Sequence, residues 1–178
     1  MVREHLLKNG SALLIRKAVV EEAPQLLQYM EAISQESDNL SFGPGEFGYS
    51  LAQEEETLLN MGKGDNTLFI VGVIDNNIVS VVTFSGGHRP RIRHRGEFGL
   101  SVRKDYWNLG IGGLMLDALI DWAKGSGVIT KINLRVRCDN RPAIRLYETK
   151  GFLKEGTMRK DGLIRGEYFD YDFMGLEL

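Results

Sequence analysis

Hydrophobic positions in the N-terminal part of the chain follow a helical period over two segments. Apolar residues of Glu22–Ser34 fall on one face of a 3.6-residue turn, and Ser50–Met61 shows a similar stripe. Between them, Asp38–Gly48 is interrupted by glycine and proline and predicts a loop. Ala12–Lys17 predicts a short strand, and residues 1–10 predict a short helix or a loose N-terminal arm. We therefore expect one strand and two helices here.

The period of the pattern changes after these helices. Thr67–Ile74, Ile78–Ser85 and Arg93–Val102 are rich in β-branched and aromatic residues and predict strands. Asp75–Asn77 predicts a tight turn between the first two strands. Gly110–Lys124 returns to the helical period and has the strongest amphipathic pattern in the chain. The middle of the chain thus predicts three strands followed by a long helix.

The C-terminal part alternates between the two patterns. Lys131–Val136 predicts a strand, and Asn140–Lys150 predicts a helix with Asn140 as its N-cap. Two further strands, Phe152–Met158 and Ile164–Met174, are expected around a turn at Lys160–Gly162. The full order is β α α β β β α β α β β, with hairpins first and a βαβ unit after them. This order predicts an α/β (α+β) fold, a mixed sheet with helices on its faces.

Composition narrows the class of protein. The chain has 178 residues, which predicts a single domain over 1–178, and its formal net charge of −2 gives no general attraction to nucleic acid. Cys138 is the only cysteine, so no intrachain disulfide can form and a reducing compartment is expected. No apolar stretch is long enough to span a bilayer, and the first residues do not resemble a signal peptide. We therefore expect a cytoplasmic protein that binds neither membrane nor nucleic acid.

The stretch YWNLGIGGLM, from Tyr106 to Met115, has three glycines at the start of the strongest helix. It lacks the spacing and the lysine of a Walker phosphate loop, and Met115 occupies the third glycine position of a dinucleotide-binding turn. Free amides at a helix N-terminus bind anions, and glycine lets a phosphate approach them. The alternative is that glycine only relieves crowding where the helix begins. The cost of glycine within a helix favours a ligand.

Two motifs in this order resemble the GNAT superfamily of acyl-CoA-dependent N-acyltransferases. The family's pyrophosphate loop, [RQ]-x-x-G-x-[GA], corresponds to Trp107–Gly112, with Trp107 in place of Arg or Gln. The family's N-x-x-A-x-x-L-Y-x-x-x-G-F corresponds to Asn140–Phe152. The form with tryptophan resembles the branch with ribosomal-protein N-terminal and polyamine acetyltransferases. This resemblance implies a mostly antiparallel sheet of about seven strands, in which the strands before and after the long helix splay apart.

The resemblance implies acetyl-CoA as co-substrate and places it in that gap. Backbone groups of the strand would pair with the pantetheine arm, the glycine loop would hold the pyrophosphate, and the next motif helix would contact the cofactor. The implied cofactor-binding residues are Leu100, Ser101, Val102, Asn108, Leu109, Gly110, Ile111, Gly112, Gly113, Asn140, Ala143, Leu146 and Tyr147. No group of His or Cys residues at ligand spacing predicts a metal site.

Two residues are candidates for the proton transfers of acyl transfer. The resemblance implies that Tyr147 is the general acid, which is chemically suitable because a phenol with a pKa near 10 is protonated at neutral pH. Glu97 is the candidate base, and strand alternation places it on the face opposite Phe98, Leu100 and Val102. The alternative for Tyr147 is a core tyrosine whose hydroxyl lies at the edge of the core. The alternative for Glu97 is a strand glutamate exposed to solvent.

The acceptor and the partners are less constrained by the sequence. Phe42, Phe47 and Tyr49 are expected on the acceptor side, and the acidic run Glu54–Glu56 could favour a cationic amine. The acceptor could be a small molecule or a protein amine, and the resemblance leaves a homodimer open. The alternating arginines of Arg89–Arg95 suggest either a basic lip for an acidic substrate or cofactor phosphate, or a charged sheet edge.

Three function classes follow from these observations. An acetyl-CoA-dependent N-acetyltransferase accounts for the most features. A non-catalytic acyl-CoA-binding regulatory module would keep the gap without the chemistry, and retention of Glu97 and Tyr147 argues against it. An RNA-binding protein that uses the arginines is disfavoured by the net charge. Cys138 has no adjacent histidine and is expected to be a small packing residue.

Overall fold

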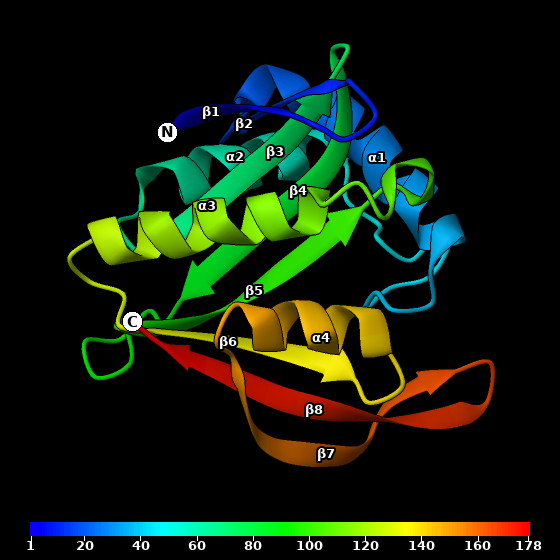
Figure 1. Cartoon of the computed structure of the whole chain (residues 1–178), viewed down its shortest axis with the longest axis vertical. Helices are drawn as coiled ribbons and strands as arrows, with labels where there is room; N and C mark the ends of the chain where they lie inside the picture. The colour runs from blue at the N-terminus through cyan, green and yellow to red at the C-terminus, as the bar shows by residue number, and fades with distance from the viewer.

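The computed structural model describes residues 1–178 and contains one eight-stranded sheet in the order β1-β2-β3-β4-β5-β6-β8-β7 (Figure 1). The strands are β1 Val2–Leu6, β2 Ala12–Lys17, β3 Thr67–Ile74, β4 Asn77–Gly86, β5 Arg95–Val102, β6 Lys131–Arg137, β7 Leu153–Ile164 and β8 Glu167–Glu177. All neighbouring pairs are antiparallel except β5 and β6, which run parallel on either side of a helical crossover. The predicted mixed α/β fold is confirmed.

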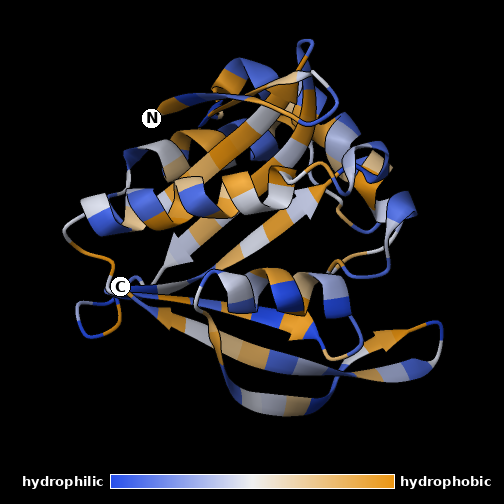
Figure 2. Cartoon of the chain, in the orientation of Figure 1, coloured by the Kyte–Doolittle hydropathy of each residue, from blue (hydrophilic) through white to orange (hydrophobic).

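Four helices cover the two faces of this sheet. They are α1 Ala23–Glu36, α2 Leu51–Lys63, α3 Ile111–Gly125 and α4 Arg141–Thr149. Helices α3 and α4 lie in front of the sheet in the view of Figure 1, and α1 and α2 lie behind it. β3, in the middle of the sheet, is almost entirely buried and appears mostly orange in Figure 2, as expected of a strand covered on both faces. None of the helices combines the length and hydropathy needed to cross a bilayer.

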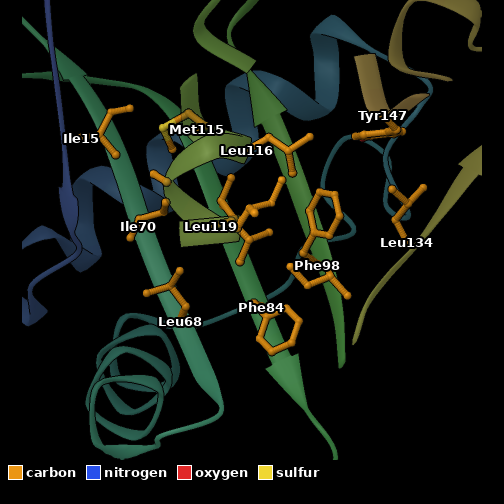
Figure 3. Close-up of a cluster of buried hydrophobic side chains, with 14 of the residues drawn as sticks. Ile15, Leu68, Ile70, Phe84, Phe98, Met115, Leu116, Leu119, Leu134 and Tyr147 are labelled. Carbon is orange, nitrogen blue, oxygen red and sulfur yellow. The ribbon is translucent and has the colours of Figure 1, made fainter. Parts of the chain in front are cut away.

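Each face of the sheet has its own hydrophobic cluster. The larger cluster joins Met115, Leu116 and Leu119 of α3 to strand residues such as Phe84 and Phe98 (Figure 3). The smaller cluster joins α1 and α2 to the opposite face, and includes Leu26, Tyr29, Leu58, Val71 and Val81. Burying one such aliphatic or aromatic side chain stabilises the fold by about 1.5–3 kcal/mol. The helical stripes predicted from the sequence are therefore the surfaces that pack.

The N-terminal residues differ from the prediction. Residues 1–10 were expected to form a short helix or an arm, but Val2–Leu6 is an edge strand, β1, paired with β2 through a hairpin. Gly10 has φ +86°, and the Gly10 N–H donates to the carbonyl of Leu7 at 2.9 Å, which closes the turn. Only one face of β1 packs against the protein, and three of its five residues are polar. The hydrophobic alternation that would predict a strand is therefore weak in this segment. It raises the strand number from the expected seven to eight.

The C-terminal hairpin also turns at a different place. The predicted turn at Lys160–Gly162 is wrong, because β7 continues to Ile164 and the two-residue turn is Arg165–Gly166. Both turn residues have positive φ, +49° and +85°, as in the tight turns that suit the twist of a hairpin. Lys160 has φ +54° and lies within a register shift between Met158 and Gly162. The turn-like sequence there forms an irregularity within the strand.

Candidate active site

The central feature of the site is a gap between β5 and β6. Their parallel pairing is confined to Arg95–Glu97 against Lys131–Asn133, although β5 continues to Val102 and β6 to Arg137. The splayed strand pair implied by the family resemblance is therefore present. The gap lies between the strand that precedes α3 and the strand that follows it.

Peptide groups on the β5 side of the gap are available to a ligand. The Arg103 N–H donates to the carbonyl of Val79 on β4 at 2.9 Å. The N–H and C=O groups of the odd-numbered residues at this end of β5 therefore point toward β4. Because peptide directions alternate along a strand, those of Leu100 and Val102 point toward the gap. Backbone groups of this kind require partners, and an extended polar chain lying in the gap would supply them.

The glycine loop presents an uninterrupted series of free amides. No backbone amide from Asn108 through Gly113 donates a hydrogen bond within the protein. The first amide of the helix with a partner is that of Leu114, which donates to the Gly110 carbonyl at 3.2 Å. Gly110 is the N-cap residue of α3 and provides no side-chain cap. These amides and the positive end of the helix dipole together form a site suited to a phosphate.

The structure accounts differently for glycine at each of the three positions Gly110, Gly112 and Gly113. Gly110 has φ +84°, a left-handed conformation that favours glycine. A Cβ atom on Gly112 would lie 3.2 Å from Leu146 Cδ2, which is tighter than ordinary contact. A Cβ atom on Gly113 would lie at 3.7 Å from Leu146 Cδ1, which is ordinary contact. Crowding therefore explains Gly112 in part, and it does not explain Gly113.

Trp107, the residue that departs from the family's loop pattern, braces this loop. Its indole N–H donates to the carbonyl of Val102, the last residue of β5, at 2.7 Å. The ring is 44% exposed. The bond fixes the loop to the strand end and occupies the Val102 carbonyl, so the Val102 N–H is the group left for a ligand in the gap.

Tyr147 lies on α4 above the same face of the sheet. Its ring packs edge-on against Phe98 of β5, with 5.8 Å between the ring centroids, and Figure 3 shows both side chains within the α3 and α4 face. The hydroxyl makes no hydrogen bond within the protein. Burial raises the pKa of Tyr147 to about 12, so the phenol is protonated at neutral pH. Asn140 caps the helix that positions it, accepting from the Ala143 N–H at 3.4 Å.

Glu97 projects from the opposite face of β5. The predicted alternation is present, with Gly96 and Phe98 buried and Glu97 exposed between them. The Arg135 Nε–H donates to the Glu97 carboxylate at 3.2 Å, a contact that the sequence analysis did not identify. Both side chains of this ion pair are about half exposed, so Glu97 is open to solvent on its face of the sheet. Tyr147 and Glu97 thus flank β5 from its two faces.

The loop between α1 and α2 spans the ends of β5 and β6. Glu36 accepts from Arg103 Nε at 2.8 Å and from the Lys104 N–H at 2.7 Å, beyond the end of β5. The Asp38 carbonyl accepts from Arg137 Nη1 of β6 at 3.0 Å, and its carboxylate pairs with Arg165 at 2.9 Å. The chain from Glu36 to Asp38 therefore bridges the open end of the gap. Sequence reasoning missed these ties.

The loop between α1 and α2 contains aromatic residues, and the start of α2 contains acidic ones. Phe42, Phe47 and Tyr49 form a stack with centroid distances of 5.2 and 4.7 Å, and Phe42 and Phe47 pack against the cluster under α1 and α2. Glu54, the first residue of the acidic run, is only 1% exposed, and its Oε1 has no hydrogen-bond partner. Burial raises the pKa of Glu54. Glu56 is exposed, so the members of the run differ in environment.

Ser101 is less available than its predicted role in cofactor binding requires. Its hydroxyl lies 2.9 Å from that of Tyr29 on α1, and its carbonyl accepts from Ser80 Oγ at 2.7 Å. Both groups are therefore engaged within the protein, away from the gap.

The arginine strip lies far from the glycine loop. Arg89–Arg93 belongs to the connection that enters β5, whereas the glycine loop follows the other end, about 26 Å away for an eight-residue strand. A hollow of about 510 Å³ lies over this connection, away from the gap, and is lined by Arg89, Pro90, Arg91 and Ile92. The strip joins two interior strands, so the sheet-edge interpretation is wrong. Its position at the far end of β5 disfavours contact with a phosphate held by the glycine loop, and the basic lip for an acidic substrate stays a prediction. Arg93 pairs with Asp65 at 2.7 Å.

Cys138 is partly buried and follows β6 directly. Its thiol donates to the Asp172 carboxylate at 3.1 Å, and burial with this contact raises the pKa of the thiol to about 11. A protonated thiol is a poor nucleophile. No group of His, Cys, Asp and Glu in the structure could hold a metal ion.

Sequence comparisons support the resemblance. Residues 26–152 match the model of the acetyltransferase (GNAT) family. An L-amino acid N-acetyltransferase of Escherichia coli (strain K12) is 34% identical over 105 residues, which are 59% of this chain and 65% of that protein. A ribosomal protein bS18-alanine N-acetyltransferase of Salmonella typhimurium is 41% identical over 64 residues, 36% of this chain and 42% of that protein. The chain thus matches less than two thirds of the length of either relative.

Further matches extend over more of the chain. A spermidine N(1)-acetyltransferase of Vibrio cholerae is 27% identical over 124 residues, 68% of this chain and 70% of that protein. The structure of a GNAT-family acetyltransferase from Streptococcus pneumoniae superposes with a TM-score of 0.91 at 30% identity, covering 93% of this chain and 99% of that one. A Salmonella typhimurium protein solved with its cofactor acetyl-CoA gives a TM-score of 0.82 at 18% identity, covering 93% and 94% of the two chains.

Proposed function

The chain belongs to the acetyltransferase (GNAT) family, and on that premise we propose that it is an N-acetyltransferase that transfers the acetyl group of acetyl-CoA directly to a primary amine. The observation that supports this most is the series of free amides from Asn108 to Gly113, which begins beside the open strand pair. A phosphate-binding loop beside an open pair of strands fits a ligand that has a pyrophosphate and an extended arm with amide groups.

We assign the parts of acetyl-CoA to this geometry as follows. The pyrophosphate accepts hydrogen bonds from the amides between Asn108 and Gly113. The pantetheine arm lies in the gap and pairs with the peptide groups of Leu100 and Val102. Leu146 packs against Gly112 and supports the loop from α4, and Ala143 and Asn140 lie at the start of that helix. Ser101 is left out because its groups are already engaged.

The two flanking side chains provide the proton transfers. Glu97 takes a proton from the incoming ammonium, directly or through water, and leaves a lone pair on nitrogen. As the C–N bond forms and the C–S bond breaks, the Tyr147 hydroxyl gives its proton to the departing thiolate. The nitrogen then loses its second proton, which returns through solvent to the Tyr147 phenolate, and the products are the neutral amide and the free thiol. Each such transfer by a positioned side chain typically contributes 10²–10⁴-fold in rate. The position of Tyr147 on the α4 side and of Glu97 on the α1 side supports an amine that approaches from the α1 side.

The acceptor is the least defined part of the proposal. The aromatic residues Phe42, Phe47 and Tyr49 support an amine whose carrier has an apolar part. Relatives named for an L-amino acid, a ribosomal protein and spermidine show how widely acceptors differ among related proteins. The homodimer and the cytoplasmic location expected from the sequence stay predictions.

A thiol-release assay with acetyl-CoA and a panel of primary amines tests this function. The panel should contain amino acids, polyamines, aminoglycosides and peptides with free N-termini. We expect at least one class to give saturable release of CoA. Stabilisation by acetyl-CoA without turnover for any class would instead indicate a non-catalytic acyl-CoA-binding module. Absence of both binding and turnover at millimolar acetyl-CoA would contradict the proposal as a whole.

A further inference from the structure

Buried polar atoms without partners are rare in this structure. Only three side-chain atoms are both buried and without a hydrogen bond, namely His5 Nε2, Glu54 Oε1 and Asn133 Oδ1. Asn133 is 1% exposed, and its Oδ1 makes no hydrogen bond within the protein. A buried amide in this state costs free energy, so its presence calls for an explanation.

Asn133 lies where the gap begins. It is opposite Glu97 in the β5–β6 register, and this is the last pair before the two strands separate. Ile132 and Leu134 point into the α3 and α4 cluster. Because side chains alternate along a strand, Asn133 points to the other face, the same face as Glu97. The amide is therefore beside the candidate base, at the closed end of the gap.

Charged neighbours of Asn133 are already paired with one another. Glu97 accepts from Arg135 on one side, and Lys131 pairs with Glu155 at 2.6 Å on the other. On β8, the neighbour is Gly175, which has no side chain to offer a donor. The Asn133 oxygen is thus buried and has no N–H or O–H partner within the protein. A ligand with a hydrogen-bond donor would fit it.

We propose that Asn133 is a contact for the acceptor amine, an inference that rests on the proposed function. Once Glu97 has taken a proton from the ammonium, a remaining N–H of the amine donates to Asn133 Oδ1. This bond turns the nitrogen lone pair toward the thioester carbonyl carbon. The amide is neutral, so it holds the amine without the strong preference for the charged ammonium that a carboxylate would have. Asn133 therefore orients the neutral amine that Glu97 has produced.

Replacement of Asn133 by leucine separates this role from a purely structural one. Leucine has a similar volume and no polar atom, so Asn133→Leu should fold with equal or higher thermal stability and keep the full rise in Tm on acetyl-CoA addition. We expect kcat/KM for the amine to fall 10- to 100-fold. A variant that is stabilised and has unchanged kcat/KM would overturn the proposal, because the amide would then have no part in turnover.

Asn133→Asp provides the conservative comparison, since it keeps an acceptor oxygen at the same reach. We expect it to retain more of kcat/KM than the leucine variant, with a rate that depends more steeply on pH because the new carboxylate titrates. Equal losses in both variants, with identical pH profiles, would contradict the contact. If Asn133→Leu fails to fold, the side-chain amide resonance of Asn133 in the wild-type protein decides. It should shift on addition of amine to the acetyl-CoA complex, and an unchanged resonance would refute the contact.

Failure of the proposed function would be distinguishable from failure of this inference. If the wild-type protein releases no thiol with any amine, the function itself is wrong and the role of Asn133 falls with it. If the wild-type protein turns over and the leucine variant matches it, only the role of Asn133 is wrong.

Discussion

The two faces of the sheet are built from different kinds of functional group. On the face covered by α3 and α4, the proposed ligand-binding groups are backbone amides of the Asn108–Gly113 loop, joined by one phenol, Tyr147, among apolar neighbours. On the face covered by α1 and α2, the proposed groups are side chains, namely Glu97 with its partner Arg135 and the unpartnered oxygen of Asn133.

This difference suggests that one face binds the cofactor, which stays the same, and that the other face binds the acceptor amine, which can vary. A backbone site depends on φ, ψ and the absence of a Cβ atom, so it binds one chemical group in one way and shows clearly as a sequence motif. A side-chain site changes with each substitution and can be adapted to different acceptors. The predictions below test whether the cofactor belongs to the first face and the amine to the second.

The largest effect is expected from Tyr147→Phe. The hydroxyl makes no hydrogen bond within the protein, so its loss should leave the fold and acetyl-CoA binding intact while kcat falls about 10²- to 10³-fold. Steady-state thiol release, together with the Tm shift on acetyl-CoA addition, measures both. A kcat within three-fold of wild type would mean that another group protonates the leaving thiolate.

Gly113→Asp tests the backbone site separately from the fold. Aspartate at the third position of a helix is favourable for the helix itself, but its carboxylate would compete with a phosphate for the same amides. We expect acetyl-CoA affinity to fall about 100-fold, which corresponds to about 2.7 kcal/mol, without loss of Tm in the free protein. Gly113→Ala is the matched control, because its Cβ atom would make only ordinary contact with Leu146 and should stabilise α3 by about 0.5–1 kcal/mol. Isothermal titration of both variants makes the comparison.

These two predictions concern features that the sequence had already indicated. The glycine loop and the motif helix could be identified because they depend on local properties, namely the helical stripe, the cap at Asn140 and the glycine spacing. The partner of Glu97 and the unpartnered state of Asn133 depend on how strands distant in sequence align, so no local pattern predicts them. The misplaced hairpin turn has the same origin, since Lys160–Gly162 resembles a turn locally while pairing with β8 extends β7 to Ile164.

Arg165→Ala tests whether the loop between α1 and α2 belongs to the acceptor face. This exposed ion pair with Asp38 should contribute less than about 1 kcal/mol to stability. Its loss removes one of the contacts that hold the Glu36–Asp38 segment across the ends of β5 and β6. We therefore expect KM for the amine to rise two- to five-fold with acetyl-CoA affinity unchanged. Arg159→Ala, on the same hairpin and without an ion pair, is the control. An equal effect of both substitutions would show that the tie is unimportant.

The smallest effect concerns the pH dependence of stability at Glu54. Burial raises the pKa of this carboxyl in the folded protein, so above about pH 4 the unfolded chain ionises it while the folded chain still holds the proton. The free energy of unfolding therefore falls as pH rises through this range. Glu54→Gln removes the dependence and should gain about 1 kcal/mol over wild type at pH 7. Chemical denaturation at pH 4 and pH 7 measures it, with the exposed Glu56→Gln as control, and no gain at pH 7 would contradict the assignment.

The division between the faces is tested most directly by two-dimensional ¹H–¹⁵N NMR of the wild-type protein, titrated first with acetyl-CoA and then with an amine found in the thiol-release screen. A desulfo analogue of acetyl-CoA in the second titration prevents turnover. Our account predicts that the cofactor shifts the backbone amides of Asn108–Gly113, and that the amine then shifts the side-chain amide of Asn133 with little further change in the loop. Cofactor shifts confined to the α1 and α2 face, or amine shifts confined to the glycine loop, would contradict it.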